Sequence, residues 1–464
     1  MIFIGARATG ERDNVKFAVS PRWQIVAAAA FVACSTYFAA SNPLIAFGIV
    51  AVALAVALPT PTFLISVLWI LLCRPGSELL VTSIGSLTLT EIDLLPLLAT
   101  IAAVRIPTAP GVRQKTSTLS WLALLAWPIW YLLRTLLPHA SSSAYFGSVA
   151  VDLRSVSMYL VFIPIGLYVH RRGAVAGIKL VCYGAYVACA IAIAAWLLLT
   201  LGFVDPARTT FVNFLSISDV RPGGELLIAV TAVMLLLGQA PLAFGSRVLS
   251  VLLLIAEVLV SQTLSLALAI AAGFVVASLL RWGSFKLSHK LLAILAVLAF
   301  AGIAFGGLSG DSRFNLASRI GEDSAQYRVT ELEVVARELS ANGLSSAIGV
   351  GPGSVIAVNN PYTHAVDLKR DTHSLYSNIV LKTGLTGLAL FLVPMVLSLR
   401  QLIAAKTLLS RAIAGSLVAV LVLSLTVPFV WTAGGFSGLA ILYVVAANLA
   451  TSRTETARTE LRTA

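Results

Sequence analysis

Long apolar segments recur along the whole of this 464-residue chain. Many of them approach the ~20 residues that a helix needs to cross the hydrocarbon core of a membrane. Hydrophobic residues make up 58% of the sequence and charged residues only 11%, which leaves no segment for a separate soluble domain. Backbone polar groups in lipid must be satisfied within the spanning segment, which favours helices for runs of this length. The sequence therefore predicts an all-α fold, a polytopic transmembrane helical bundle.

The apolar runs divide the chain into predicted membrane spans and the loops between them. A window of ~19 residues predicts about 14 spans, with a range of roughly 12 to 14, because the third run is short for a full crossing. The runs lie near 23–41, 43–59, 62–73, 92–105, 119–137, 149–169, 177–202, 223–239, 246–260, 263–281, 290–307, 384–399, 411–430 and 435–450. We expect a cytoplasmic N-terminal segment, a transmembrane bundle, a long extracytoplasmic loop, C-terminal spans and a cytoplasmic tail at 1–22, 23–307, 308–383, 384–450 and 451–464.

Basic residues predict the orientation of the chain, because short cytoplasmic loops hold the excess of Lys and Arg. With the N-terminus inside, nearly every basic cluster falls on one side, including Arg171, Arg172 and Lys179. If the third run did not cross the membrane, every later loop would lie on the opposite side, so the agreement of the basic clusters also supports this crossing. The first 22 residues carry scattered charges and no apolar centre, so we expect no cleavable signal peptide. We predict a multi-pass protein of the cytoplasmic (inner) membrane with both termini inside.

Charge and cysteine content indicate which classes of partner and cofactor to expect. The net charge of +12 follows the predicted topology, so we expect membrane lipids and no nucleic acid as partners. The four cysteines lie in or beside apolar runs, without His or Cys at metal-ligand spacing, at Cys34, Cys73, Cys182 and Cys189. We therefore expect no metal site and no cofactor.

The 308–383 loop is much longer than ordinary connections, and loops of this kind are usually functional or disordered. Its segment AQYRVTELEVVARELSANGL predicts an amphipathic helix that stops at Asn342 and Gly343. The apolar face of this helix is expected to contain Val329, Leu332, Val335, Ala336 and Leu339. The helix is followed by IGVGPGSV at 348–355, which we interpret as a structural turn around Gly351 and Gly353. Glycine-rich stretches also bind phosphates, but this one lacks the P-loop spacing.

Arginines on the outer side need a separate explanation, because the topological bias depletes them there. They are Arg134, Arg154, Arg221, Arg319 and Arg328. The planar guanidinium suits bidentate contact with phosphate oxygens, so these residues predict a site for an anionic, phosphorylated substrate. Alternatively, each arginine reaches lipid headgroups or pairs with Asp152, Glu225 or Glu322.

Two further ionisable residues lie beside or within apolar runs. His373 comes shortly before the run at 384–399, where a neighbouring carboxylate such as Asp371 could tune it as a base. A capping role for His373 is equally compatible with its position. Glu257 lies near the outer end of its run, where it could mark a proton path or orient an arginine.

The loop as a whole resembles the O-antigen ligase and polymerase superfamily of polytopic membrane glycosyltransferases. The resemblance rests on SRIGEDSAQYR, GVGPGS and THSLYSNIVLKTGLTGLALFL, and it covers about 310–395. The corresponding residues are Arg319, Arg328, Gly349, Gly351, Gly353, His373, Gly384 and Gly387. The chain differs from the family at Ser374, where Asn is usual, and at 261–265, where SQTLS replaces a Ser-Arg-Gly step.

The resemblance implies metal-independent transfer of a glycan from an undecaprenyl-pyrophosphate-linked donor on the extracytoplasmic face, in cell-surface polysaccharide biosynthesis. The acceptor would be a glycan, a lipid or a protein, which leaves polymerase and ligase both open. His373 would be the base, and a diphosphate would contact Arg154, Arg221, Arg319 and Arg328. Supporting roles would fall to Asp371, Gly351, Gly353 and Glu257. A transporter or flippase of lipid-linked oligosaccharides is the alternative, and a non-catalytic membrane subunit is a third possibility.

The predicted topology can be tested directly. Reporter fusions at Ser309 and Asn360 should read as extracytoplasmic, and a fusion after Ala450 should read as cytoplasmic. A cytoplasmic signal from either of the first two fusions would contradict the placement of the loop.

Overall fold

The computed structural model describes fifteen labelled helices and strands and a few residues between them. The described residues are 81–84, 87–90, 100, 101, 103, 104, 106, 118–137, 149, 152, 153, 156, 162–201, 213, 214, 220, 221, 225–240, 254, 264–281, 323–341, 343–360, 365–425, 438–447 and 449. The predicted terminal segments 1–22 and 451–464, the first three predicted spans and the run at 290–307 lie outside them. The count of about 14 spans therefore stays a prediction.

The described part of the chain is mostly helical, at 82% of its residues. The helices are α5 (Thr118–Leu136), α7 (Phe162–Arg172), α8 (Ala174–Thr200), α9 (Glu225–Leu236), α11 (Leu264–Arg281), α14 (Asp323–Ser340), α15 (Gly343–Ile348), α16 (Leu375–Ala405) and α17 (Leu408–Leu423). Three antiparallel hairpins, absent from the all-α prediction, are formed by β1 (Val81–Ile84) with β2 (Leu87–Thr90), β3 (Asn213–Phe214) with β4 (Val220–Arg221), and β5 (Ile356–Asn359) with β6 (Val366–Lys369). The helical prediction is confirmed in its coarse form.

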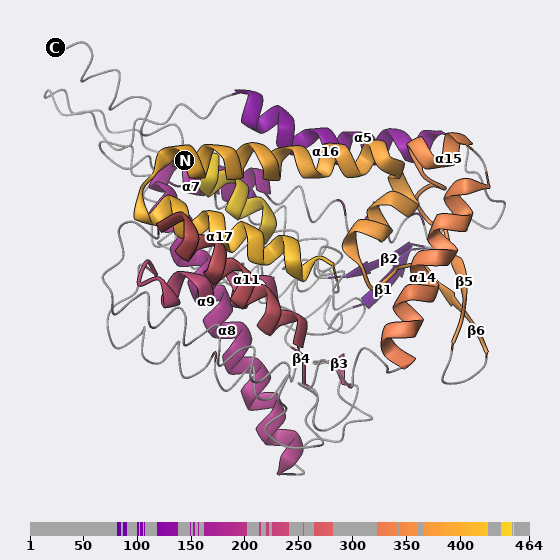
Figure 1. Ribbon diagram of the computed structural model, residues 1–464, viewed down its shortest axis with the longest axis horizontal. Coiled ribbons are helices and arrows are strands. Elements are labelled where there is room, and N and C mark those ends of the chain that lie inside the picture. The colour runs from indigo at the N-terminus through magenta and orange to yellow at the C-terminus, as the bar shows by residue number, and fades with distance from the viewer. Residues whose placement is uncertain are drawn as a thin grey trace, which may run out of the picture.

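The core is formed by α9, α11 and α17, with α8 packed on α9 and α5 against α16 (Figure 1). Helix α9 is apolar on every side and is buried along its length, as expected for a central helix. The crossing of α11 and α17 depends on two glycines. A Cβ atom added to Gly273 would lie only 2.6 Å from the carbonyl oxygen of Gly415. Small residues at helix crossings of this kind are typical of membrane bundles.

Helix α16 is the one described helix that is long and apolar enough to cross a membrane. It starts at Leu375, nine residues before the predicted span, and it is kinked at Gly384, where φ is +70°. The kink frees backbone groups of the preceding turn, and the indole Nε1 of Trp130 donates to the Thr383 carbonyl over 3.0 Å. The last residues of the predicted loop, 375–383, therefore form the first turns of α16, before its kink at Gly384.

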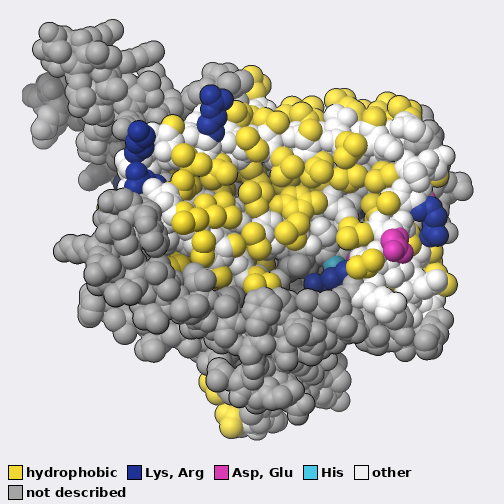
Figure 2. Space-filling view, in the orientation of Figure 1, with side chains coloured by type: hydrophobic (Ala, Val, Ile, Leu, Met, Phe, Trp, Pro, Cys, Tyr) yellow, Lys and Arg dark blue, Asp and Glu magenta, His cyan; other side chains and the backbone are white. Residues whose placement is uncertain are grey.

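The exposed surface of α5 and α16 is largely apolar, and Figure 2 shows it as one broad face. Leu136 is 82% exposed, and Leu122, Leu385 and Val396 are about 60% exposed. Large exposed apolar faces of this kind are typical of surfaces that bind another protein or a membrane.

The α14, α15 and β5–β6 segments gather at one end of α16 (Figure 1). Helix α14 ends at Ser340, two residues before the predicted stop at Asn342, and its predicted apolar face is confirmed only for Val335, which is buried, and Leu339, which packs on the core. Val329 and Leu332 are 54% and 50% exposed, whereas Tyr327 and Glu331 are buried. The reason is that α14 packs on the buried side of β5, where Tyr327, Val334 and Val335 meet Ile356 and Val358, and that Lys369 of β6 binds Glu331 on the same side.

We predict that Gly384→Ala lowers the thermal stability of the purified protein. The positive φ alone costs about 1–3 kcal/mol for a residue with a Cβ atom, and this Cβ would collide with the backbone of Ala347. Gly343→Ala is the matched control, because nothing lies within 4 Å of its Cβ position. An unchanged unfolding midpoint for Gly384→Ala, measured in detergent, would contradict the kinked geometry.

Candidate functional site

His373 and Glu331 form the centre of the candidate site. His373 lies two residues before α16, and Glu331 lies in the middle of α14. The Nδ1 atom of His373 is 2.8 Å from one carboxylate oxygen of Glu331 and 2.9 Å from the other. The backbone N–H of His373 also donates to this carboxylate over 3.1 Å. The loop and the helix thus fix the histidine through both its ring and its backbone.

The same carboxylate is held by a second cation. Lys369, the last residue of β6, donates from Nζ to Glu331 over 2.9 Å. Its ammonium group also lies 4.1 Å from the centre of the Tyr327 ring, and that ring packs edge-on against His373 with 5.8 Å between centroids. The Tyr327 hydroxyl donates to Asp367 over 3.0 Å. The pair is therefore enclosed by α14 on one side and by the β5–β6 hairpin on the other.

The surroundings determine the charge of Glu331. Its side chain is only 2% exposed, and burial opposes ionisation, but hydrogen bonds from His373 and Lys369 outweigh this and hold its pKa below the ordinary value. Burial likewise opposes the charge of Lys369, yet Tyr327 and Glu331 keep the pKa of its ammonium group raised. Glu331 is therefore a carboxylate at neutral pH, and Lys369 is a cation beside it.

This arrangement selects one tautomer of His373. An ionised carboxylate accepts hydrogen bonds only, so Nδ1 must carry the proton that points at Glu331. In the neutral ring, Nε2 then has the lone pair, and no described residue forms a hydrogen bond with it. The His373 side chain is 40% exposed. Figure 2 shows a histidine and adjacent Lys or Arg atoms in a recess beside the apolar face.

A second charged group lies next to this pair and contains Asp371. Lys382, fully buried in α16, is 2.6 Å from Asp152 and 3.2 Å from Asp371. Arg370 reaches both carboxylates, at 3.6 Å and 3.2 Å. The carboxylate next to His373 is thus Glu331 and not Asp371, whose oxygens are engaged by Lys382 and Arg370. The prediction chose Asp371 because it is near in sequence, whereas α14 brings the partner from 42 residues away.

The glycine-rich turn has a structural role. Gly349, Gly351 and Gly353 all have positive φ. Arg134 is buried at the end of α5, and its guanidinium donates to the carbonyls of Ile348, Gly349 and Val350 over 2.8–3.0 Å. The other side of the turn is held by Asp152, which accepts the N–H of Gly353 over 2.7 Å. These contacts support the interpretation as a structural turn and assign Arg134 to its support.

The structure describes only some of the remaining predicted site residues. Arg328 is half-buried in the second turn of α14, three residues before Glu331 on the same side of the helix. The backbone of Arg221 lies in β4, paired with Asn213. Arg154, Arg319 and Glu257 lie outside the described residues. The convergence of these arginines on one ligand therefore stays a prediction.

Sequence reasoning missed Glu331, Lys369 and Arg370. Glu331 begins ELEVVAREL, which also contains Glu333 and Glu338, so the sequence alone does not single it out. Lys369 belongs to VDLK, whose alternation is typical of a short strand. In the observed β5–β6 hairpin Lys369 pairs with Ile356, and this register places Lys369 beside Glu331.

Comparison with known proteins adds no assignment. No protein-family model and no curated protein matches this chain. The resemblance of the loop to the O-antigen ligase and polymerase superfamily therefore rests on the residues quoted above, and the function is argued from the site.

The charge of Glu331 predicts how stability depends on pH. A depressed pKa contributes stability that is complete above the ordinary value of 4.5 and is lost as pH falls through the folded-state value. Wild type should therefore unfold at a higher temperature than Glu331→Gln at neutral pH, and the difference should shrink below about pH 4. Glu333→Gln, which changes an exposed residue of the same helix, is the control. A difference that is the same at neutral pH and in acid would contradict an ionised Glu331.

Proposed function

We propose that this chain is a metal-independent membrane glycosyltransferase that transfers or polymerises a glycan from an undecaprenyl-pyrophosphate-linked donor. The observation that carries the proposal is the Glu331–His373 pair, which presents a basic nitrogen beside the start of the apolar helix α16. A lipid-linked donor holds its reactive headgroup at the membrane surface, so a base for such a substrate belongs at this depth. The resemblance of the loop to O-antigen ligases and polymerases supports the same assignment.

The proposed chemistry begins with the acceptor hydroxyl. Nε2 of His373 accepts its proton as the hydroxyl oxygen attacks the anomeric carbon of the donor sugar. The bond from this carbon to the pyrophosphate oxygen breaks, and its electron pair leaves with the undecaprenyl pyrophosphate. The products are a new glycosidic bond and the lipid carrier. Glu331 stabilises the imidazolium that forms, because the carboxylate already accepts the Nδ1 hydrogen.

Cationic side chains would stabilise the charge on the leaving pyrophosphate. Arg328 is one candidate, since it lies three residues before Glu331 on α14. Arg370 is also a candidate, because its side chain is 37% exposed three residues before His373. The roles proposed for Arg154, Arg221 and Arg319 complete this group.

The membrane setting is part of the proposal. Support comes from α16, from the apolar outer face of α5 and α16, and from the apolar runs in the sequence. In this setting α14, α15 and the β5–β6 hairpin form the extracytoplasmic side of a chain of about 14 spans, with both termini inside the cell. The donor approaches along the lipid, and the acceptor approaches from the aqueous side.

The alternative is a transporter or flippase for lipid-linked oligosaccharides. The buried Lys382–Asp152 pair favours it, because ionisable residues inside a helical bundle often lie on a transport path. A transporter moves its substrate without forming a glycosidic bond. An assay with purified protein, donor and acceptor in detergent therefore distinguishes the two functions.

We predict that His373→Ala and His373→Asn both lower the transfer rate by about 10²- to 10⁴-fold. Asn keeps the capping ability of the position but cannot act as a base near neutral pH. Transfer should be measured with purified lipid-linked donor, beside binding of the donor, which should change little in either variant.

His364→Asn is the matched control, because it removes the other histidine of the 308–383 loop. Near-normal turnover by His373→Asn would exclude His373 as the base and make Asp371 the next residue to test.

A further inference from the structure

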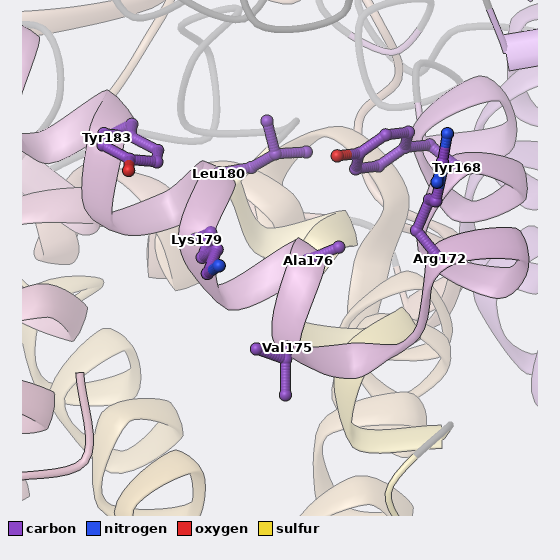
Figure 3. A pocket seen from close by; sticks show the side chains of 7 residues that line it. All are labelled: Tyr168, Arg172, Val175, Ala176, Lys179, Leu180 and Tyr183. Carbon is purple, nitrogen blue, oxygen red and sulfur yellow. The ribbon is translucent and has the colours of Figure 1, made fainter. Parts of the chain in front are cut away.

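A pocket lies at the elbow between α7 and α8 and has a volume of about 360 Å³. Gly173, with φ of +89°, forms the turn that joins the two helices. Figure 3 shows Tyr168 and Arg172 extending from α7, while Val175, Lys179 and Leu180 extend from α8. In Figure 1, α7 lies at the end of the molecule opposite α14 and the β5–β6 hairpin. This α7–α8 pocket is therefore separate from the His373 site.

Two cations line the α7–α8 pocket. Arg172 and Lys179 are both exposed, and neither forms a hydrogen bond or ion pair with any residue in the described part of the chain. The neighbouring Arg171 differs, because its Nη1 donates to the carbonyls of Ala103, Val104 and Ile106 over 2.8–3.0 Å. Arg171 thus supports the fold, whereas the charges of Arg172 and Lys179 line the pocket. No acidic side chain lines the pocket to neutralise them.

The rest of the pocket wall is apolar or aromatic. Leu180 and the ring of Tyr168 are buried in the wall, while Val175 and Tyr183 are about half exposed at its rim. Figure 3 shows the Tyr168 hydroxyl directed towards Leu180 across the gap. The volume lies within the range of small-molecule sites, roughly 300–1,000 Å³. Cations, a phenolic hydroxyl and an apolar wall together suit a ligand that is anionic at one end and apolar at the other.

We propose that the α7–α8 pocket binds the phosphate headgroup of an anionic phospholipid. The pocket lies among the basic residues that predict the cytoplasmic side, where anionic lipids are abundant and basic pockets between helices bind their headgroups. Arg172 and Lys179 contact the phosphate oxygens, and the Val175–Tyr183 side of α8 contacts the first part of the acyl chains. The inference rests on the membrane setting of the proposed function but not on its chemistry.

The test measures lipid binding to the full chain purified in a neutral detergent. Short-chain phosphatidylglycerol is titrated while the thermal unfolding midpoint is followed, with short-chain phosphatidylcholine and inorganic phosphate as separate arms. Phosphatidylglycerol should raise the midpoint of wild type. Arg172→Gln with Lys179→Gln should weaken its apparent affinity by about tenfold for each lost cation. Arg400→Gln with Lys406→Gln removes equal charge outside the pocket and should leave the affinity unchanged.

The three titrations distinguish an anionic lipid headgroup from free phosphate as the ligand of the pocket. An unchanged affinity in the Arg172 and Lys179 double variant would overturn the proposal, as would an equal effect of phosphatidylcholine. Inorganic phosphate that matches phosphatidylglycerol would show a site for free phosphate and would overturn the lipid assignment. If the double variant does not fold, Lys179→Gln alone decides the question, since this exposed side chain can change without disturbing the core. Glycan transfer is not measured, so failure of the proposed function would not affect the result.

Discussion

The buried contact between Lys382 and Asp152 is the interaction on which the arrangement of the site depends. The two charged atoms are 2.6 Å apart, and neither side chain is more than 2% exposed. A buried ion pair is stable only when its remaining hydrogen-bonding capacity is filled. Here Asp152 also accepts the N–H of Gly353, and Lys382 also contacts Asp371. One charged group therefore ties the first turns of α16 to the glycine turn and to the helical residues around Asp152.

The pairing of His373 with Glu331 follows from this anchoring. The start of α16 fixes the backbone of His373, while α14 and the β5–β6 hairpin bring Glu331 and Lys369 to it. Lys382 and Arg370 are shared by Asp152 and Asp371, so Glu331 accepts from His373 without competition from Asp371. Fixed positions matter here because a general base acts only within hydrogen-bond reach of the proton that it removes.

Periodicity and composition predicted the helical class, the stop after Ser340 and the position of His373 just before a long apolar helix. These sequence signals failed at residues whose burial and partners depend on tertiary packing. The predicted apolar face of α14 assumed that Leu332 would be buried, but the helix buries Glu331, since its partners lie on the β5–β6 hairpin. Arg134 was grouped with possible phosphate ligands because a sequence does not show that four carbonyls surround its guanidinium.

The most direct test of the account is the tautomer of His373, which ¹⁵N NMR of histidine-labelled protein can report. The chain has only five histidines, so the His373 signals can be assigned by their loss in His373→Asn. In the neutral form of the ring we predict the proton on Nδ1 and a bare Nε2, and a changed Nδ1 signal in Glu331→Gln. A neutral ring with its proton on Nε2 would contradict the assignment of Nε2 as the base.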